Sequence, residues 1–362
     1  MDEWRSYHVY YTDIDRLLLE CIGPCLRTLD GSLSMYFWER HYAGGRHVRV
    51  RFRGSVADLN VVGKQFVSAV QRYLELYPSA RLTNYSSDDA RQMLEMEGEV
   101  YDPDDLNYRI NAICEQQYQR LKSRYVQGEG LELLHEFLHD SNALTVAMLK
   151  DPAAKLDNLL SLFFLNALFV DGGLQQGSVS YKSHWSGFAA TFGGRPIIER
   201  IRRSFEEQKD SIIARMLEVQ DAYSRRNFSH QPVLAEWHRL LDKYGRKAKV
   251  LLSSGVQISF TMTPHEIRGY RDFVGQHAHE KSEFMQVLLE DERFVAAFRH
   301  EQSLAWPRVL VNLLYMIVPA LGLTILDRMA LCYFAHRGVE THLQCDLTDV
   351  LRTTITTTLR NY

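Results

Sequence analysis

The sequence predicts an α+β fold in which an N-terminal ferredoxin-like split βαβ half packs on a larger, mainly helical body. The first 85 residues alternate stretches of period-two hydrophobicity with stretches of three-to-four spacing, in the order strand, helix, strand, strand, helix, strand. Beyond residue 86, apolar residues recur mostly at helical spacing. The chain shows no repeat and no low-complexity linker, so we expect one domain over residues 1–362, with a sheet portion at 1–85 and a helical body at 86–362.

The N-terminal portion is expected to contain four strands and two helices. In the third strand, apolar residues alternate strictly with Arg49, Arg51 and Arg53, so one face is apolar and the other is cationic. Asp13 is a suitable N-cap for the first helix, whereas Pro24 should kink or break that helix. The predicted strands are 5–12, 33–40, 46–53 and 80–85, and the predicted helices are 13–29 and 56–77.

The rest of the chain is predominantly helical in its pattern, with turn-forming stretches at 172–173, 193–194 and 253–255. Two short stretches, 177–181 and 256–262, alternate as strands do. The predicted helices are 88–97, 105–123, 130–149, 153–170, 182–191, 195–226, 231–253, 264–275, 280–298, 300–318, 322–336 and 346–358.

Composition is typical of a globular protein. The apolar fraction is 46%, the charged fraction is 24% and the formal net charge is −3, so the whole chain carries no electrostatic sign of nucleic-acid binding. The five cysteines are scattered and form no CxxC pair, which fits free thiols in a reducing cytoplasm. There is no secretory signal pattern, and Asn312 and Pro319 interrupt the apolar run 309–326. We therefore expect a cytoplasmic protein without a membrane partner.

One stretch matches a zinc-binding motif. His135 and His139 stand four residues apart with a glutamate between them, the spacing at which a helix presents two imidazoles to one metal ion. The third ligand of the zinc proteases is missing, and the alternative is that both histidines flank an apolar core face. We predict no metal. A second pair, His277 and His279, lies in a polar loop, where solvated histidines are the simpler interpretation.

Two basic clusters are candidate peptide-binding surfaces. If the second and third strands pair, the arginines of the third strand share a face with the Arg-His pair that ends the second, and this face could grip an anion or a peptide backbone. A helix after residue 195 carries further arginines. For both clusters, the alternative is a solvated surface. The candidate binding residues are Arg40, His41, Arg49, Arg51, Arg202 and Arg203.

The order and spacing of the first 53 residues resemble a known family. Tyr10-Tyr11 is followed by Asp-x-x-x-Leu-Leu at 13–18, Tyr-Phe-x-x-Arg-His at 36–41 and Gly-Gly-x-His-Val-Arg-x-Arg-Phe at 44–52. This string is similar to the N-terminal motif of the thiopeptide-type bacteriocin biosynthesis proteins, relatives of the elimination domain of lanthipeptide dehydratases. The resemblance implies the fold of that domain. It also implies that the partner is a ribosomally made precursor peptide with its leader, gripped by the basic residues.

The family that the sequence resembles has two main activities. One branch eliminates glutamate from glutamylated Ser or Thr. The other branch, the thiopeptide pyridine synthases, joins two dehydroalanines by a formal aza-Diels–Alder (4+2) cycloaddition and expels the leader. In the elimination branch, a late helix carries Leu-His-Met-x-x-Asn-Arg, whose histidine is taken as the acid–base group. Here Tyr315 replaces that histidine, and Pro319-Ala320 replaces Asn-Arg.

Two segments hold the predicted catalytic residues. A phenol with an ordinary pKa of about 10 abstracts an α-proton poorly but donates a proton well, so Tyr315 favours the pyridine-forming branch; the alternative is a core tyrosine. Tyr181, Ser183 and His184 follow a glycine-rich turn, and we expect them at a helix start with free backbone N–H groups. There the alternative is a Ser N-cap beside an exposed histidine.

We therefore predict a thiopeptide pyridine synthase that cyclises two dehydroalanines of a precursor peptide, with dehydration and loss of the leader. A stand-alone glutamate-eliminating lyase is the alternative, and a non-catalytic peptide-binding scaffold is the second alternative. The sequence has no dinucleotide-binding glycine motif, no P-loop and no complete metal set, so we expect an enzyme without a cofactor. The oligomeric state is left open.

Overall fold

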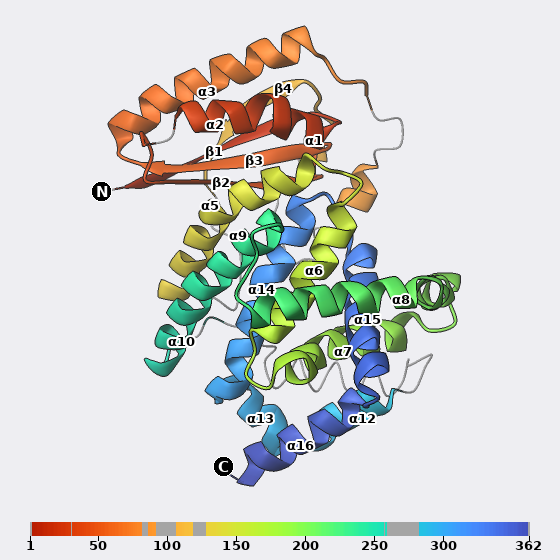
Figure 1. The fold of residues 1–362 in the computed structure, drawn as a ribbon. Coiled ribbons are helices and arrows are strands. Elements are labelled where there is room, and N and C mark those ends of the chain that lie inside the picture. The colour runs from red at the N-terminus through yellow and green to blue at the C-terminus, as the bar shows by residue number, and fades with distance from the viewer. Residues whose placement is uncertain are drawn as a thin grey trace. The chain divides into compact units, whose positions relative to one another are not determined.

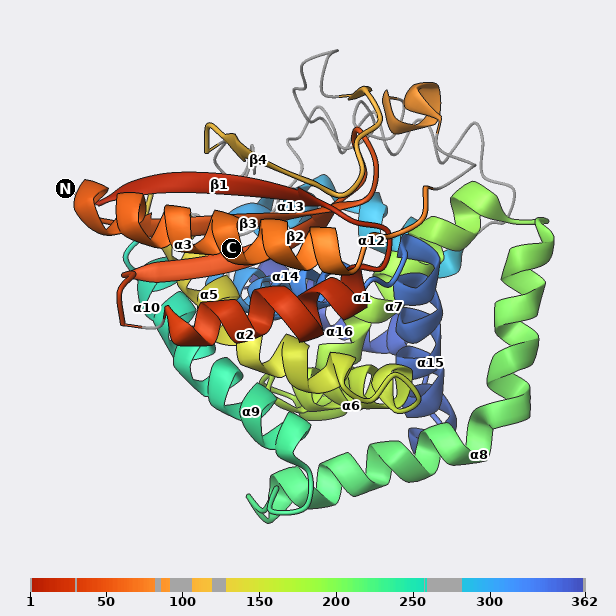
Figure 2. The same ribbon diagram turned by 90° about the horizontal axis from the view of Figure 1, so that it is seen from above.

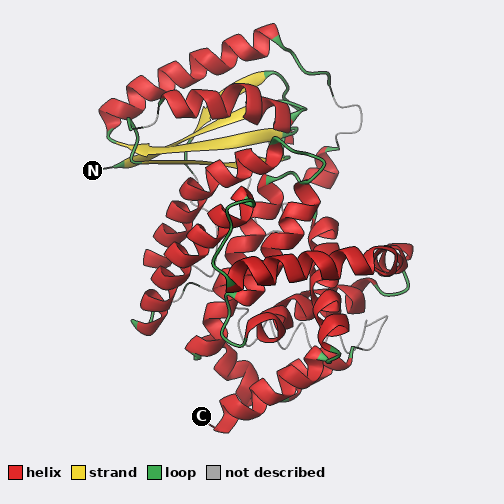
Figure 3. Ribbon diagram, in the orientation of Figure 1, coloured by secondary structure: helices red, strands yellow, loops and turns green. Residues whose placement is uncertain are grey.

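The computed structural model describes residues 2–29, 31–81, 86–91, 106–118, 128–256, 258 and 282–360. The chain forms two compact units (Figures 1 and 3). The sheet unit comprises Met1–Lys122, Leu134–Pro152 and Pro319–Gly322. The helical unit comprises Ser123–Leu133, Ala153–Val318 and Leu323–Tyr362.

The sheet unit contains a four-stranded antiparallel sheet in the order β2-β3-β1-β4. A helical segment joins β1 to β2 and a long helix follows β3, so the connectivity is that of a ferredoxin-like βαββαβ motif, as predicted. The strands are β1 (Glu3–Tyr10), β2 (Met35–His41), β3 (His47–Gly54) and β4 (Ala112–Gln116).

The predicted helices of the sheet unit are confirmed and cover one face of the sheet (Figure 2). On this face, the Phe66 ring packs against Tyr7 of β1 and Phe52 of β3. Asp13 caps the first helix by accepting from the Arg16 N–H. The interruption expected at Pro24 takes the form of a π-helical turn just before it, beside the residue that lacks an N–H. The helices are α1 (Ile14–Leu17), η1 (Leu18–Ile22), α2 (Gly23–Thr28) and α3 (Val56–Leu76).

The fourth strand does not lie where the sequence predicts it. Residues 80–81 are not in a strand, and 82–85 lie outside the described residues. The edge strand is instead β4, inside the predicted helix 105–123, which is wrong in its described part. Here pairing with β1, with Val9 opposite Ile113, overrides the local helical pattern. Most of the predicted elements 88–97 and 256–262, and all of 264–275, lie outside the described residues.

The helical unit is built from the helices that the sequence predicts, and most boundaries agree within a few residues. In it, α15 packs against α6, α7 and α8. α5 spans both units, and α14 ends in the sheet unit. The helices are α5 (Glu129–Leu149), α6 (Lys155–Leu168), α7 (Gly173–Phe192), α8 (Pro196–Ser224), α9 (Pro232–Leu240), η3 (Leu241–Gly245), α10 (Arg246–Ser253), α12 (Glu283–Glu290), α13 (Glu292–His300), α14 (Gln302–Ala320), α15 (Ile325–Leu343) and α16 (Leu347–Arg360).

Two predictions in this unit are corrected. The strand 177–181 is wrong, because these residues lie inside α7. Gly177 lets α7 approach α6 closely, since an added Cβ would collide with the Ala167 backbone. The helix 280–298 is two helices, because the Asp291 side chain caps a new helix by accepting from the N–H groups of Arg293 and Phe294.

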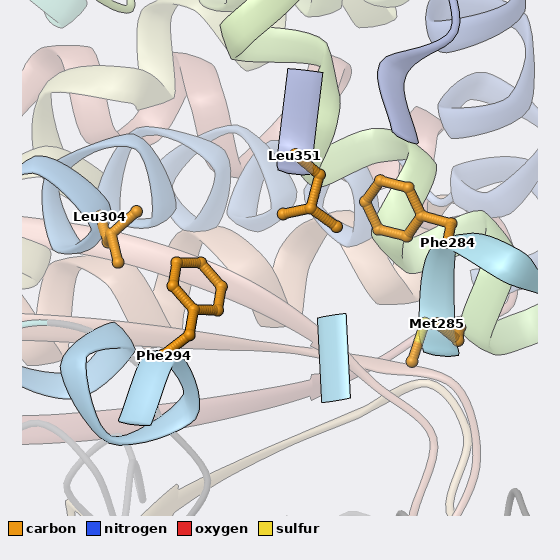
Figure 4. Close-up of a cluster of buried hydrophobic side chains, with 5 residues drawn as sticks. All are labelled: Phe284, Met285, Phe294, Leu304 and Leu351. Carbon is orange, nitrogen blue, oxygen red and sulfur yellow. The ribbon is translucent and has the colours of Figure 1, made fainter. Parts of the chain in front are cut away.

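The C-terminal helices share a hydrophobic cluster of their own. Its side chains come from α12, α13, α14 and α16 and converge on one another (Figure 4). The cluster anchors α16, whose remaining surface is largely polar. Its buried members are Phe284, Met285, Phe294, Leu304 and Leu351.

The apolar run 309–326 lies mainly in α14, where Leu310, Leu313 and Leu314 are fully buried. Within the described ranges, no single helix is long and apolar enough to cross a membrane. Taken together, α6 and α7 are long and apolar enough by length and composition only, and the two helices are bent by 118° relative to each other.

Candidate functional site

Side chains from three helices meet around Tyr315 in the helical unit. The Tyr315 hydroxyl lies 3.0 Å from the Cys332 Sγ. The His184 ring meets the Tyr315 ring edge-on, with centroids 5.1 Å apart, and the Arg328 guanidinium carbon lies 4.8 Å from the Tyr315 ring centroid. The Phe163 ring contacts both tyrosines of this group. We call these residues the Tyr315 cluster: Tyr181, His184, Tyr315, Arg328 and Cys332.

Helical spacing accounts for this convergence. Tyr181 and His184 are three residues apart on α7, and Arg328 and Cys332 are four apart on α15, so each pair lies on one side of its helix. Packing of α7 against α15 brings the two pairs together. The structure therefore gathers three of the four predicted catalytic residues, Tyr181, His184 and Tyr315, in one place.

Tyr315 is a protonated phenol at neutral pH. Burial raises its pKa well above the ordinary value of 10, the neighbouring Cys332 adds to this effect, and the Arg328 cation opposes it. Among the described residues, the hydroxyl makes its hydrogen bond with a thiol, which is a weak hydrogen-bonding group. A stronger acceptor on a bound substrate would compete for the Tyr315 proton, so the geometry suits a proton donor rather than a base.

His184 is a neutral acceptor beside this donor. Its pKa is lowered to about 4, mainly by desolvation among the surrounding protein groups and also by the Arg328 charge, while the hydrogen bond to Ser180 opposes the shift. Its Nδ1 lies 2.7 Å from the Ser180 carbonyl oxygen, so the ring proton is on Nδ1. The Nε2 atom keeps its lone pair, and the side chain reaches solvent at the surface although protein groups surround the ring on its other sides. Donor and acceptor groups are thus adjacent.

The other two predicted residues of α7 are placed differently. Tyr181 is fully buried, and its hydroxyl donates to the Phe163 carbonyl at 3.0 Å and accepts from Asn166 Nδ2 at 3.2 Å. Ser183 is half-buried and lies about 100° around the helix from its neighbour His184. The predicted helix start at this segment is wrong: α7 begins at Gly173, so the N–H groups of residues 181–184 are inside the helix.

A buried carboxylate follows the cluster along α7 and α15. The Lys182 Nζ lies 2.6 Å from Glu340 Oε1 and 2.5 Å from Asp346 Oδ1. Glu340 also accepts from Arg337 at 2.9 Å and from the Leu347 N–H at 3.2 Å. Burial opposes its ionisation, but interactions with His336 and then with Lys182 hold its pKa well below the ordinary 4.5. Sequence analysis missed this network, because Lys182 and Glu340 are 158 residues apart and no local pattern relates them.

The predicted cationic strand face exists in the sheet unit. Strand register places His41 opposite His47, and His8 opposite Arg49, on the face away from α3. Arg40 is opposite Val48 on the other face, so the prediction that it joins the arginines is wrong. It instead donates to the Ala320 carbonyl and pairs with Asp15. We call the remaining set the basic face: His8, His41, His47, Arg49, Arg51 and Arg53.

The basic face keeps His8 and His47 neutral. The pKa of His8 is lowered to about 3, mainly by burial and also by Arg49, Arg51 and other nearby cations. Burial also lowers the pKa of His47, whose ring stacks near His8 with centroids 5.1 Å apart. Arg51 is buried and pairs with Glu39. The part of the face that is not buried therefore carries the half-buried guanidinium groups of Arg49 and Arg53 and the neutral imidazole of His8.

The buried His47 should make stability acid-sensitive. The unfolded chain protonates this imidazole below pH 6.5, whereas the folded chain does not. The free energy of unfolding is therefore unaffected by His47 above pH 6.5, and it decreases by up to about 1.4 kcal/mol for each pH unit below that value. In melting curves between pH 8 and pH 5, His47→Gln should show a shallower dependence than the parent. The exposed His230→Gln is the matched control; equal slopes for all three proteins would contradict the assignment.

The two histidines of the zinc-like motif make hydrogen bonds with different groups. His135 Nε2 lies 2.8 Å from the Tyr118 hydroxyl, and His139 Nδ1 lies 2.9 Å from the Tyr36 carbonyl oxygen. Within the residues that the structure describes, no three His, Cys, Asp or Glu side chains form a group that could hold a metal ion. His277 and His279 lie outside those residues.

The basic stretch of α8 is mixed in charge. Arg202 donates to Glu199 at 2.8 Å, and Arg203 is exposed beside the exposed Glu206 and Glu207. The structure places these arginines on the α8 surface, where their role in leader binding stays a prediction.

The fold can now be compared with known proteins. Residues 4–339 match the family described as lantibiotic biosynthesis dehydratase C-term. Because this match spans nearly the whole chain, the protein belongs to that family. A search of curated proteins finds no significant match.

Two solved structures share the fold over almost their whole lengths. The pyridine synthase TbtD from thiomuracin biosynthesis is 21% identical, with a TM-score of 0.73 over 93% of this chain and 98% of that one. TsrL is 16% identical, with a TM-score of 0.68 over 97% of this chain and 98% of that one. At these identities, the likeness establishes the α+β fold that the sequence predicts.

Proposed function

We propose that the protein is a pyridine synthase of thiopeptide biosynthesis. The observation that carries the proposal is the Tyr315 cluster, in which a protonated phenol stands where the resemblance places the histidine of the elimination branch. The fold that the chain shares with the pyridine synthase TbtD supports the same choice. The substrate would be a ribosomally made peptide with two dehydroalanines and a leader.

The cluster supplies the two proton movements that such a ring closure needs. One dehydroalanine amide must pass to its iminol form, which requires a donor near its oxygen and an acceptor near its nitrogen. Tyr315 is the donor in this proposal, and the lone pair of His184 Nε2 is the acceptor. Two carbon–carbon bonds then close the six-membered ring: the two alkene CH2 carbons join, and the iminol carbon joins the Cα of the second dehydroalanine, with the amide nitrogen already part of the diene. Water and the leader, as its carboxamide, leave to form the pyridine, and positioning of the two alkenes supplies much of the acceleration.

The basic face is the proposed grip for the peptide. Arg49 and Arg53 are half-buried and carry guanidinium groups on a rigid strand, and His41 extends the same face. By contrast, Arg51 is buried and pairs with Glu39. Guanidinium groups bind peptide carbonyl and carboxylate oxygens in a fixed geometry. This role does not depend on which reaction the enzyme catalyses.

The test is incubation with a thiazole-bearing precursor that contains two dehydroalanines, followed by mass spectrometry. In the absence of added cofactor, we expect two products, a macrocycle and a leader carboxamide. Their combined mass should be one water less than the mass of the precursor. A glutamylated precursor should stay unchanged. Release of glutamate from that second peptide would instead identify a glutamate-eliminating lyase, and binding of both peptides without a mass change would identify a scaffold.

A further inference from the structure

Arg328 brings a cation into the Tyr315 cluster, and no side chain among the described residues neutralises it. The guanidinium makes no hydrogen bond or ion pair with any described residue, and its Nε is buried without an acceptor. The guanidinium lies against the face of the Tyr315 ring. A cation–π contact compensates only part of the cost of desolvating a guanidinium.

The neighbouring acids are occupied elsewhere. Asp327 accepts from the N–H and hydroxyl of Thr324 in the capping box of α15. Glu340, further along the same helix, is held by Lys182 and Arg337. Buried donors are normally satisfied, so an unsatisfied guanidinium N–H in a site points to a missing acceptor.

The Arg328 charge acts on all three reactive neighbours. It lowers the pKa of the Tyr315 phenol and the Cys332 thiol against the larger effect of burial, and it lowers the pKa of His184. Each effect favours negative charge and disfavours positive charge at the cluster. Such a field suits an oxygen atom on which negative charge develops.

We propose that Arg328 is the oxyanion-binding residue of the Tyr315 cluster. Its buried Nε–H and its terminal N–H groups donate to a peptide carbonyl oxygen of the substrate, next to the donor Tyr315. The oxygen gains negative charge as its amide loses the N–H proton to His184, and the fixed guanidinium stabilises that charge. This inference rests on the proposed function for the identity of the substrate. The ability of Arg328 to bind an anion does not depend on that function.

The first test measures the site without the reaction. The His184 ring signals are followed by NMR while sodium acetate replaces sodium chloride at constant ionic strength. Acetate should shift these signals in the parent and in Arg246→Gln, a charge-matched control whose exposed side chain pairs with Asp242. It should not shift them in Arg328→Gln. Equal shifts in Arg328→Gln, or no shift in the parent, would overturn the proposal.

The second test measures the reaction. With the dehydroalanine precursor, Arg328→Gln should lower kcat about 100-fold or more while changing KM less, because the interaction forms mainly in the transition state. Arg328→Lys should recover only part of the rate, since an ammonium lacks the planar donor fork. A parent that binds acetate through Arg328 but does not cyclise the precursor would refute the proposed function and leave the anion site standing. Full activity of Arg328→Gln would refute the catalytic role.

Discussion

Tyr315→Phe should lower the rate of cyclisation about 100-fold or more, roughly 3 kcal/mol of transition-state stabilisation, while the fold is kept. The ring volume is unchanged, so the contacts with Phe163, His184 and Arg328 are retained. Only the hydroxyl is lost, together with its contact to the Cys332 thiol, whose loss should cost on the order of 1 kcal/mol of stability. Single-turnover rates and melting temperature measure the two effects separately.

Tyr333→Phe is the matched control for this substitution. Tyr333 is as buried as Tyr315, both at 9% exposure, and lies in the same unit with its ring 4.4 Å from that of Trp185. We expect this variant to keep full activity. If Tyr315→Phe were also fully active and only slightly destabilised, Tyr315 would be a core tyrosine, and the argument from a phenol in place of an imidazole would fail.

The sheet was predictable because its strands carry their pattern locally. The arginines of β3 alternate with buried apolar residues, and this period-two pattern fixes which face each side chain occupies. β4 was not predictable, because its five residues become a strand by pairing with β1. Arg40 was assigned to the wrong face because it was grouped with its neighbour His41, whereas consecutive residues of a strand point to opposite faces of the sheet.

The candidate site was predictable only in part, for a related reason. Tyr315 and His184 were chosen as residue types suited to proton transfer, and helix packing brings them together. Arg328 could not be found in this way, because a single arginine near the start of a helix resembles any solvated arginine until its neighbours are known. The glycines before α7 suggested a later helix start, whereas Gly173 and Gly177 are part of the helix itself.

Glu340→Gln should be the most destabilising of these substitutions, at about 3 kcal/mol. Removing one partner of a buried ion pair leaves the other charge without compensation. Glu340 is 6% exposed and holds Lys182 and Arg337, which joins α7 to α15. Burial lowers the pKa of the adjacent His336, so that ring is neutral at pH 7 and leaves the two cations to hold the carboxylate. Urea unfolding at pH 7 measures the loss.

Asp346→Asn is the control for this prediction, because Asp346 contacts the same Lys182 from a half-exposed position and should contribute less than about 1 kcal/mol. The pH dependence gives a second check. Because folding lowers the pKa of Glu340, its stabilisation is complete above the ordinary value of 4.5 and is lost as the pH falls towards the folded-state value. The difference in stability between the parent and Glu340→Gln should therefore be constant from pH 7 to pH 5.5 and narrow below pH 4.5. A difference that stays constant into the acid range would show that Glu340 stabilises the fold through packing rather than charge.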